Sequence, residues 1–141
     1  MENQILVKAL NKRHTVLEKR ILLNSKKVLK YIKRKGLLVE VFIVSDKRIR
    51  NLNFKFRAKD TPTNVLSFEL KDWPAVDSNR KRVKPIGEVY LAPDYIRREN
   101  ESLERLLTHG ILHLLGYDHK RKGDSIRMEN LEKRVFRRFG F

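Results

Sequence analysis

Three of the four histidines of this chain lie within eleven residues, at positions 109, 113 and 119. His109 and His113 are four residues apart, so on an α-helix their imidazoles lie on one face, one turn from each other. Gly116 adopts a left-handed conformation at little steric cost, which would end the helix and let His119 point back toward the other two. The spacing therefore predicts that His109, His113 and His119 bind one metal ion.

A site of three imidazoles leaves a coordination position for water, which is typical of catalytic rather than structural zinc. The chain has no cysteine, so thiolate-rich structural sites are excluded. Metzincin metalloproteases share this histidine spacing, but they carry a glutamate general base directly after the first histidine. Gly110 stands at that position here and accepts no proton, which argues against ordinary zinc peptidase chemistry. We expect one divalent ion per chain, zinc by inference, although nickel or another divalent ion also binds such sites in purified proteins.

The net charge indicates the kind of partner. Lysine and arginine number 33 against 17 aspartates and glutamates, which leaves a formal charge of +16. Such a surface attracts polyanions, and RNA is the phosphate polymer that we expect it to meet. The alternative, a densely charged surface that is merely solvated, predicts a more even balance of signs. No apolar run is long enough to cross a membrane or to resemble a secretory signal, so we expect a cytoplasmic protein.

The elements that position the histidines follow from the apolar pattern. Residues 1–141 fit one domain with a core of its own. Helical periodicity and end signals predict helices at 15–35, 46–54, 101–115 and 124–139 and a helix starting at Pro93, and strands are predicted at 3–10, 37–44, 65–70 and 86–91. Ser45 is expected to cap the second helix, and Gly36 to end the first. His14, far from the other histidines, is interpreted as a surface residue.

The function of one basic loop and of one arginine cannot be decided from composition and spacing. Residues 71–85 form a connection longer than most loops of compact domains, and it contains the ring of Trp73 beside Arg80, Lys81 and Arg82. This combination suits stacking on RNA bases and contact with phosphates, and it equally suits an exposed hairpin tip. Arg57, taken alone, is best interpreted as a solvated surface charge.

Three motifs in a fixed order closely resemble the YbeY family of bacterial metal-dependent endoribonucleases, which act in ribosomal RNA maturation. The first joins Asn53, Arg57, Asp60 and Thr63 to the run Val65-Leu66-Ser67-Phe68, the second is Gly87-Glu88-Val89, and the third is the histidine motif at residues 109–119. The final helix, with Met128 and Glu132, also resembles that of the family. One position departs from the family pattern, because Asn64 stands where an aspartate is usual. The amide keeps much of the hydrogen-bonding shape but carries no charge.

The resemblance implies an α+β fold, with a small mixed β-sheet packed against several helices and a metzincin-like site of three histidines. It also implies that Arg57 is a catalytic residue. The implied activity is zinc-dependent, single-strand-specific endoribonuclease action in ribosomal RNA processing, small-subunit maturation and ribosome quality control. The implied partners are ribosomal RNA, the small ribosomal subunit and the GTPase Era.

Several chemical roles stay open at this stage. Since Gly110 is no base, the attacking group is a water molecule, with or without help from Glu88 or Asp118, or the 2′-hydroxyl of the RNA itself. Asp118 could equally orient an imidazole through a hydrogen bond. Two other functions compete with the nuclease: an RNA-binding assembly factor of the ribosome whose metal is structural, and a metal-dependent hydrolase of another substrate, such as a peptide.

Overall fold

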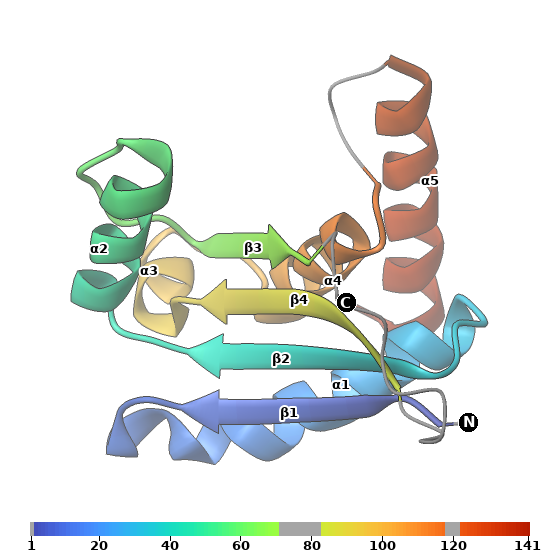
Figure 1. The fold of residues 1–141 in the computed structure, drawn as a ribbon, viewed down its shortest axis with the longest axis horizontal. Helices are drawn as coiled ribbons and strands as arrows, with labels where there is room; N and C mark the ends of the chain where they lie inside the picture. The colour runs from blue at the N-terminus through green and yellow to red at the C-terminus, as the bar shows by residue number, and fades with distance from the viewer. Residues whose placement is uncertain (1, 71–82, 118–121) are drawn as a thin grey trace.

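The computed structural model describes residues 2–70, 83–117 and 122–141. A mixed four-stranded sheet forms its centre, in the order β1-β2-β4-β3 (Figure 1). Strands β1 (Gln4–Ala9), β2 (Leu37–Ile43) and β4 (Lys84–Leu91) are parallel, and β3 (Val65–Glu69) runs antiparallel to β4 at the edge. The predicted α+β fold with a small mixed sheet is therefore confirmed.

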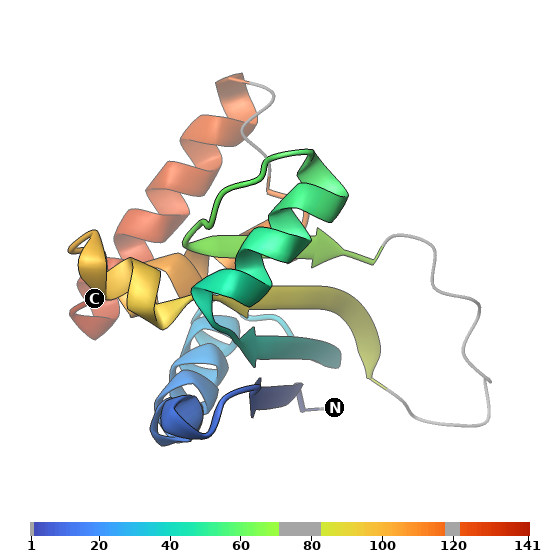
Figure 2. The same cartoon turned by 90° about the vertical axis from the view of Figure 1, so that its left-hand side faces the viewer.

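The helices lie on one face of the sheet and at the carboxyl ends of its parallel strands (Figures 1 and 2). A 3-10 helix, η1 (Lys12–Leu17), leads into α1 (Glu18–Tyr31), which connects the parallel strands β1 and β2. Helix α4 (Leu103–Leu114) packs on β3 and β4 beside α1, and α5 (Lys122–Phe139) packs against α4. Helices α2 (Asp46–Arg57) and α3 (Pro93–Arg98) complete the fold.

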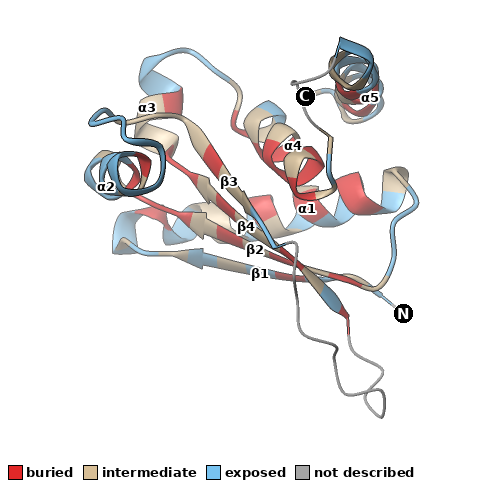
Figure 3. Ribbon diagram, turned by 45° about the horizontal axis from the view of Figure 1, so that its top comes forward, coloured by how far each residue is buried: buried red, intermediate tan, exposed pale blue. Residues whose placement is uncertain are grey.

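The core lies between the sheet and helices α1 and α4. Alternate residues of β2 are buried on this side, from Leu37 to Ile43, while Leu38, Glu40 and Phe42 face the opposite side and are only partly covered (Figure 3). This alternation follows from the two-residue period of a strand. Met128 of α5 is fully buried there. In the described residues, no helix combines the length and apolarity needed to cross a membrane.

Three details differ from the sequence-based predictions. The first predicted helix divides into η1 and α1 and ends at Tyr31, five residues before Gly36. The 3-10 geometry changes which side chains face the core, so His14 is buried, with 3% of its surface exposed, while Val16 is 81% exposed. The interpretation of His14 as a surface residue was therefore wrong. Helix α2 begins at the predicted cap, since the Ser45 hydroxyl accepts a hydrogen bond from the Arg48 amide, but continues to Arg57.

Candidate active site

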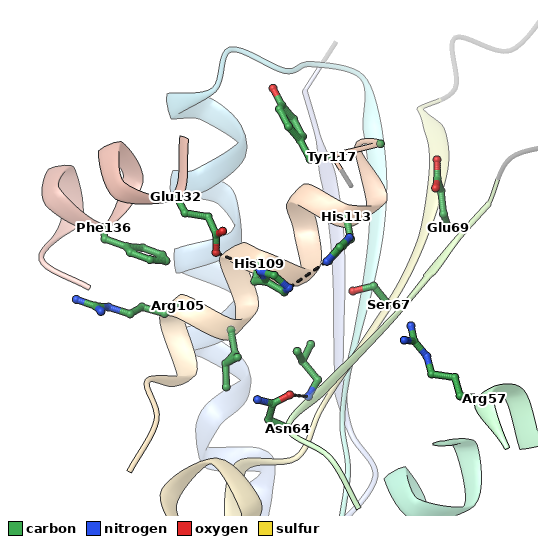
Figure 4. Close-up of a pocket in the computed structure, with 13 residues that line it drawn as sticks. Arg57, Asn64, Ser67, Glu69, Arg105, His109, His113, Tyr117, Glu132 and Phe136 are labelled. Atoms are coloured by element: carbon green, nitrogen blue, oxygen red, sulfur yellow. Dashed lines mark hydrogen bonds and ion pairs between the residues drawn. The ribbon is translucent and has the colours of Figure 1, made fainter. Parts of the chain in front are cut away.

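The histidines predicted to lie on one helix face do so on α4. The helix begins where the Ser102 hydroxyl accepts a hydrogen bond from the Arg105 amide, and its apolar side is buried against the sheet. His109 and His113 lie in its last two turns with their Nε2 atoms 3.0 Å apart and their ring planes at 81° (Figure 4). Both ring nitrogens therefore point to the same small volume, which is the arrangement required for two ligands of one cation.

Glu132 of α5 contacts the ring of His109 at the nitrogen that does not face His113. Its Oε2 atom lies 3.2 Å from Nδ1 of His109, and 15% of the Glu132 side chain is exposed. An imidazole whose Nδ1 donates its proton to a carboxylate presents an unprotonated Nε2, the tautomer that binds metal. The residues present therefore fit a divalent ion that accepts imidazole ligands.

Helix α4 approaches the sheet closely because residue 110 has no side chain. A Cβ atom at Gly110 would lie 2.8 Å from Cγ1 of Val89 and 3.1 Å from Oγ of Ser67. The Ser67 hydroxyl instead donates a hydrogen bond to the Gly110 carbonyl oxygen over 3.2 Å. There is thus no space for a glutamate beside His109, which gives a structural reason for the missing general base of the peptidase pattern.

A pocket of about 750 Å³ opens in front of the two histidines. Helices α4 and α5, strand β3 and the end of α2 supply its walls (Figure 4). The pocket carries charges of both signs, from Arg57, Arg105, Glu69 and Glu132, and it is further lined by Asn64, Val65, Ser67, Leu106, Gly116, Tyr117 and Phe136.

Arg57 belongs to this pocket, although it is exposed and was assigned a functional role only through the family resemblance. It is the last residue of α2, and Ala58 ends the helix in a left-handed conformation with φ of 56°. The buried Asn53 side chain donates a hydrogen bond to the Thr61 carbonyl over 2.9 Å, which fixes the loop after the helix. This loop brings the motif residues Arg57 and Asn64 to the same pocket as the histidines.

Asn64 uses both ends of its amide. Its Oδ1 atom accepts a hydrogen bond from the Val65 backbone amide over 2.7 Å, and its Nδ2 atom donates to both carboxylate oxygens of Glu101, over 3.2 and 3.1 Å. An aspartate, the usual residue of the family, has no proton to donate to Glu101 when it is ionised. The amide of Asn64 therefore makes hydrogen bonds to the Glu101 carboxylate that an ionised aspartate could not make.

The structure does not bring Glu88 to the histidines. Ser67 and Val89 pair across β3 and β4 and face α4, so Glu88, the next residue of β4, faces the opposite side of the sheet. There it accepts a hydrogen bond from the Tyr90 hydroxyl over 2.6 Å. Burial, followed by this hydrogen bond, raises the pKa of Tyr90. Strand alternation thus separates Glu88 from the pocket and corrects its assignment as a helper of the metal centre.

The remaining predicted residues lie outside the described residues. These are the third ligand, His119, its neighbour Asp118, and the suggested RNA contacts Trp73, Arg80, Lys81 and Arg82. Within the described ranges, no three His, Asp or Glu side chains form a group that would hold a metal ion. The ligand set with His119 therefore stays a prediction, as do the RNA contacts of residues 73–82.

Sequence reasoning assigned no site role to Glu132, Arg105 or Ser67. The signal for Glu132 was weak but present, because it follows the core residue Met128 by one helical turn and so lies near the packed face of α5. Ser67 lies in the strand motif, where the alternation of side chains predicts which face of the sheet it occupies. The alternation does not predict its hydrogen bond to Gly110 of α4. Arg105 was one of many arginines, and its place in the pocket depends on how α4 and α5 pack.

Comparison with known proteins supports the family assignment. The sequence profile described as Endoribonuclease YbeY matches residues 4–140. Proteins named Endoribonuclease YbeY from Rhizobium etli and Alcanivorax borkumensis are 38% and 41% identical to this chain over 112 and 107 residues. These alignments cover 72% and 70% of this chain, but 63% and 61% of the two relatives. The chain thus spans somewhat less than two thirds of their length.

A third relative and one solved structure extend the comparison. Endoribonuclease YbeY of a Wolbachia strain from Drosophila simulans is 35% identical over 111 residues, which are 73% of this chain and 69% of that protein. The solution structure of TM1509 from Thermotoga maritima is similar, with a TM-score of 0.53 and 27% identity over 96% of this chain and 91% of that one. Motifs, pocket and relatives agree, and this chain belongs to the YbeY endoribonuclease family.

Proposed function

We propose that this protein is a zinc-dependent endoribonuclease that cleaves single-stranded RNA and acts in ribosomal RNA processing, small-subunit maturation and ribosome quality control. The observation that carries the proposal is the convergence of the His109 and His113 Nε2 atoms, 3.0 Å apart, in a pocket that also contains Arg57. The family names of the relatives add the reaction type, and the charge of +16 favours a polyanionic substrate. We further propose a cytoplasmic protein whose partners include the small ribosomal subunit and the GTPase Era.

In this proposal, different residues of the chain would bind the metal ion, orient a ligand and bind the phosphate. His109 and His113, with His119 as third ligand, would hold the ion, and Glu132 would keep His109 in the tautomer that binds it. When bound, zinc supplies Lewis acidity toward a phosphoryl oxygen and activates water. Arg57 would donate hydrogen bonds to the phosphate oxygens, where negative charge increases in the transition state.

The pocket also favours a single strand over a duplex. Its volume of about 750 Å³ is that of a small-ligand cavity. An unpaired strand can place one scissile phosphate between Arg57 and the histidines, because its backbone bends freely, whereas a duplex would have to insert both strands. Arg105 contributes a second cation at the far wall, where its guanidinium lies over the Phe136 ring at 4.9 Å.

Cleavage of a labelled ribosomal RNA fragment by metal-stripped protein tests the proposal. Zinc should restore cleavage to the original protein. The variants His113→Ala and Arg57→Ala should remain folded but should not cleave the RNA. Arg57→Lys should also be impaired, since an ammonium group lacks the planar pair of donors. Arg48→Ala, an exposed change on the same helix, is the matched control and should keep full activity.

Any of three results would overturn the proposed nuclease activity. Cleavage that survives both substitutions would come from a contaminant. A protein that stays inert with zinc but binds RNA would instead be an assembly factor with a structural metal, and digestion of a peptide library would indicate a different hydrolase.

A further inference from the structure

Five cationic side chains surround a second concavity, about 600 Å³ in volume, that shares no lining residue with the histidine pocket. We call this surface the α1 basic patch, and it consists of Lys26, Lys30, Lys33, Arg34 and Lys35. All five residues are exposed. They occupy the last turns of α1 and the connection to β2, and the concavity is further lined by Glu2 and Asn3.

The cations of the α1 basic patch resemble other described lysines in having no ion pair, but here five cations share one concavity. Within the described residues, none of the five is in an ion pair, whereas six arginines at other places pair with carboxylates: Arg13, Arg20, Arg50, Arg97, Arg98 and Arg127. Lys26 and Lys30 are also four residues apart on one helix face, where like charges repel. Attraction to the negative end of the helix dipole gives a structural reason for a cation at Lys30. It gives none for the three cations that follow the helix.

The backbone holds the patch in a fixed shape. Lys33 has a left-handed conformation, with φ of 58°, and the Arg34 amide donates to the Leu29 carbonyl over 3.0 Å. The side chain of Asn3 then fixes the loop from both sides, donating to the Arg34 carbonyl over 2.8 Å and accepting from the Leu37 amide over 3.0 Å. The backbone positions that carry the charges are therefore set before any partner binds, which lowers part of the entropic cost of binding.

Aromatic residues of α5 lie both at the histidine pocket and against the end of α1 that carries the patch. Phe136 lines the pocket and lies under Arg105, and Phe139, three residues further along α5, contacts the Tyr31 ring with centroids 5.8 Å apart. Tyr31 directly follows Lys30 of the patch. One side of α5 thus leads from the pocket to the patch, and its end carries Arg137 and Arg138, both exposed.

We propose that the α1 basic patch binds the phosphate backbone of RNA, without sequence preference, at a distance from the cleavage pocket. The inference rests on the proposed function for the identity of the polyanion. Unpaired cations on a preformed concave surface release counterions when phosphates bind, which is the main source of sequence-independent affinity. The patch would hold a long RNA while a single-stranded part of it enters the histidine pocket.

Salt-dependent binding tests this role apart from cleavage. The triple variant Lys26→Gln, Lys30→Gln, Lys33→Gln should bind a labelled, folded ribosomal RNA fragment roughly tenfold to a hundredfold more weakly at moderate salt. Its plot of log affinity against log salt should be less steep by about 2 to 3, since each lost phosphate contact removes about 0.7 to 0.9. The control triple variant Lys8→Gln, Lys12→Gln, Lys47→Gln loses the same charge from other exposed positions and should change the slope much less.

Cleavage of a short single-stranded oligonucleotide separates the two proposals. The patch variant should cleave it at the rate of the original protein, because such a substrate is too short to reach both surfaces. If the original protein binds RNA through the patch yet cleaves nothing, the proposed function fails and the patch stands. If the patch variant binds RNA as the original protein does, or if both triple variants lose the same affinity, the patch proposal is overturned.

Discussion

The carboxylate of Glu132 lies 3.2 Å from Nδ1 of His109, although the two residues are 23 positions apart and on different helices. A partner of this kind sets the tautomer and the orientation of an imidazole ligand. The packing of α5 on α4 therefore shapes the proposed metal site as well as the core.

Replacement of Glu132 by Gln should weaken zinc binding by about tenfold to a hundredfold, because the amide keeps the shape of the carboxylate but loses its charge. Competition with a chromogenic chelator measures this affinity directly, without any RNA. Glu129→Gln, at an exposed position of the same helix, is the matched control and should leave zinc affinity unchanged. Equal affinities for both variants would show that Glu132 does not support the ligand.

A methyl group at residue 110 should destabilise the protein by about 1–3 kcal/mol, since Gly110→Ala forces a Cβ to within 2.8 Å of the fully buried Val89 side chain. The gain in helix propensity, about 1 kcal/mol, offsets part of this cost. Denaturant unfolding of the metal-free protein provides the measurement. Gly123→Ala in α5 has no atom within 4 Å of the new Cβ and should be neutral or stabilising. A Gly110→Ala protein as stable as this control would contradict the close approach of α4 to the sheet.

The sequence predicted those parts of the site that depend on local periodicity. The four-residue separation of His109 and His113 was enough to place both on one helix face, and Ser45 identified the start of α2. Glu132 and Arg105 could not be assigned in the same way, because the contact between α4 and α5 joins segments far apart in the chain. Arg57 illustrates an intermediate case, since its residue type was uninformative and only the surrounding motif gave it a role.

Asn64→Asp should destabilise the protein by about 1 kcal/mol, because a carboxylate at residue 64 cannot donate to Glu101 and would repel it at about 3.1 Å. The loss is modest since Glu101 is exposed. Glu101→Gln introduced with Asn64→Asp should recover most of the stability, because the new amide donates in the reverse direction. A double-mutant cycle from unfolding curves measures this coupling. Additive effects of the two changes would mean that the pair contributes nothing.

His14 is a residue whose burial the sequence did not indicate. Its Nε2 atom lies 3.4 Å from Oδ1 of Asp94, and within the described residues its buried Nδ1 atom has no hydrogen-bond partner. Burial, followed by the nearby charges of Arg13 and Arg97, lowers the pKa of His14 below its ordinary value of 6.5, and Asp46 opposes this shift. A surface position was expected because His14 stands far from the other three histidines, and nothing in the sequence signalled the 3-10 turn that buries it.

The lowered pKa of His14 makes the folded state less stable in acid. The unfolded chain takes up this proton as the pH falls through about 6.5, whereas the folded protein takes it up only at lower pH. Stability should therefore be highest above pH 6.5 and decrease below it until the folded-state pKa is reached, by at most about 1.4 kcal/mol per pH unit from this group. His14→Gln removes the titration, so its stability between pH 7 and 5, measured by urea unfolding, should fall less steeply than that of the original protein. The slope is the informative quantity, because the substitution also changes packing at every pH. Parallel curves for the two proteins would show that His14 titrates alike in the folded and unfolded states.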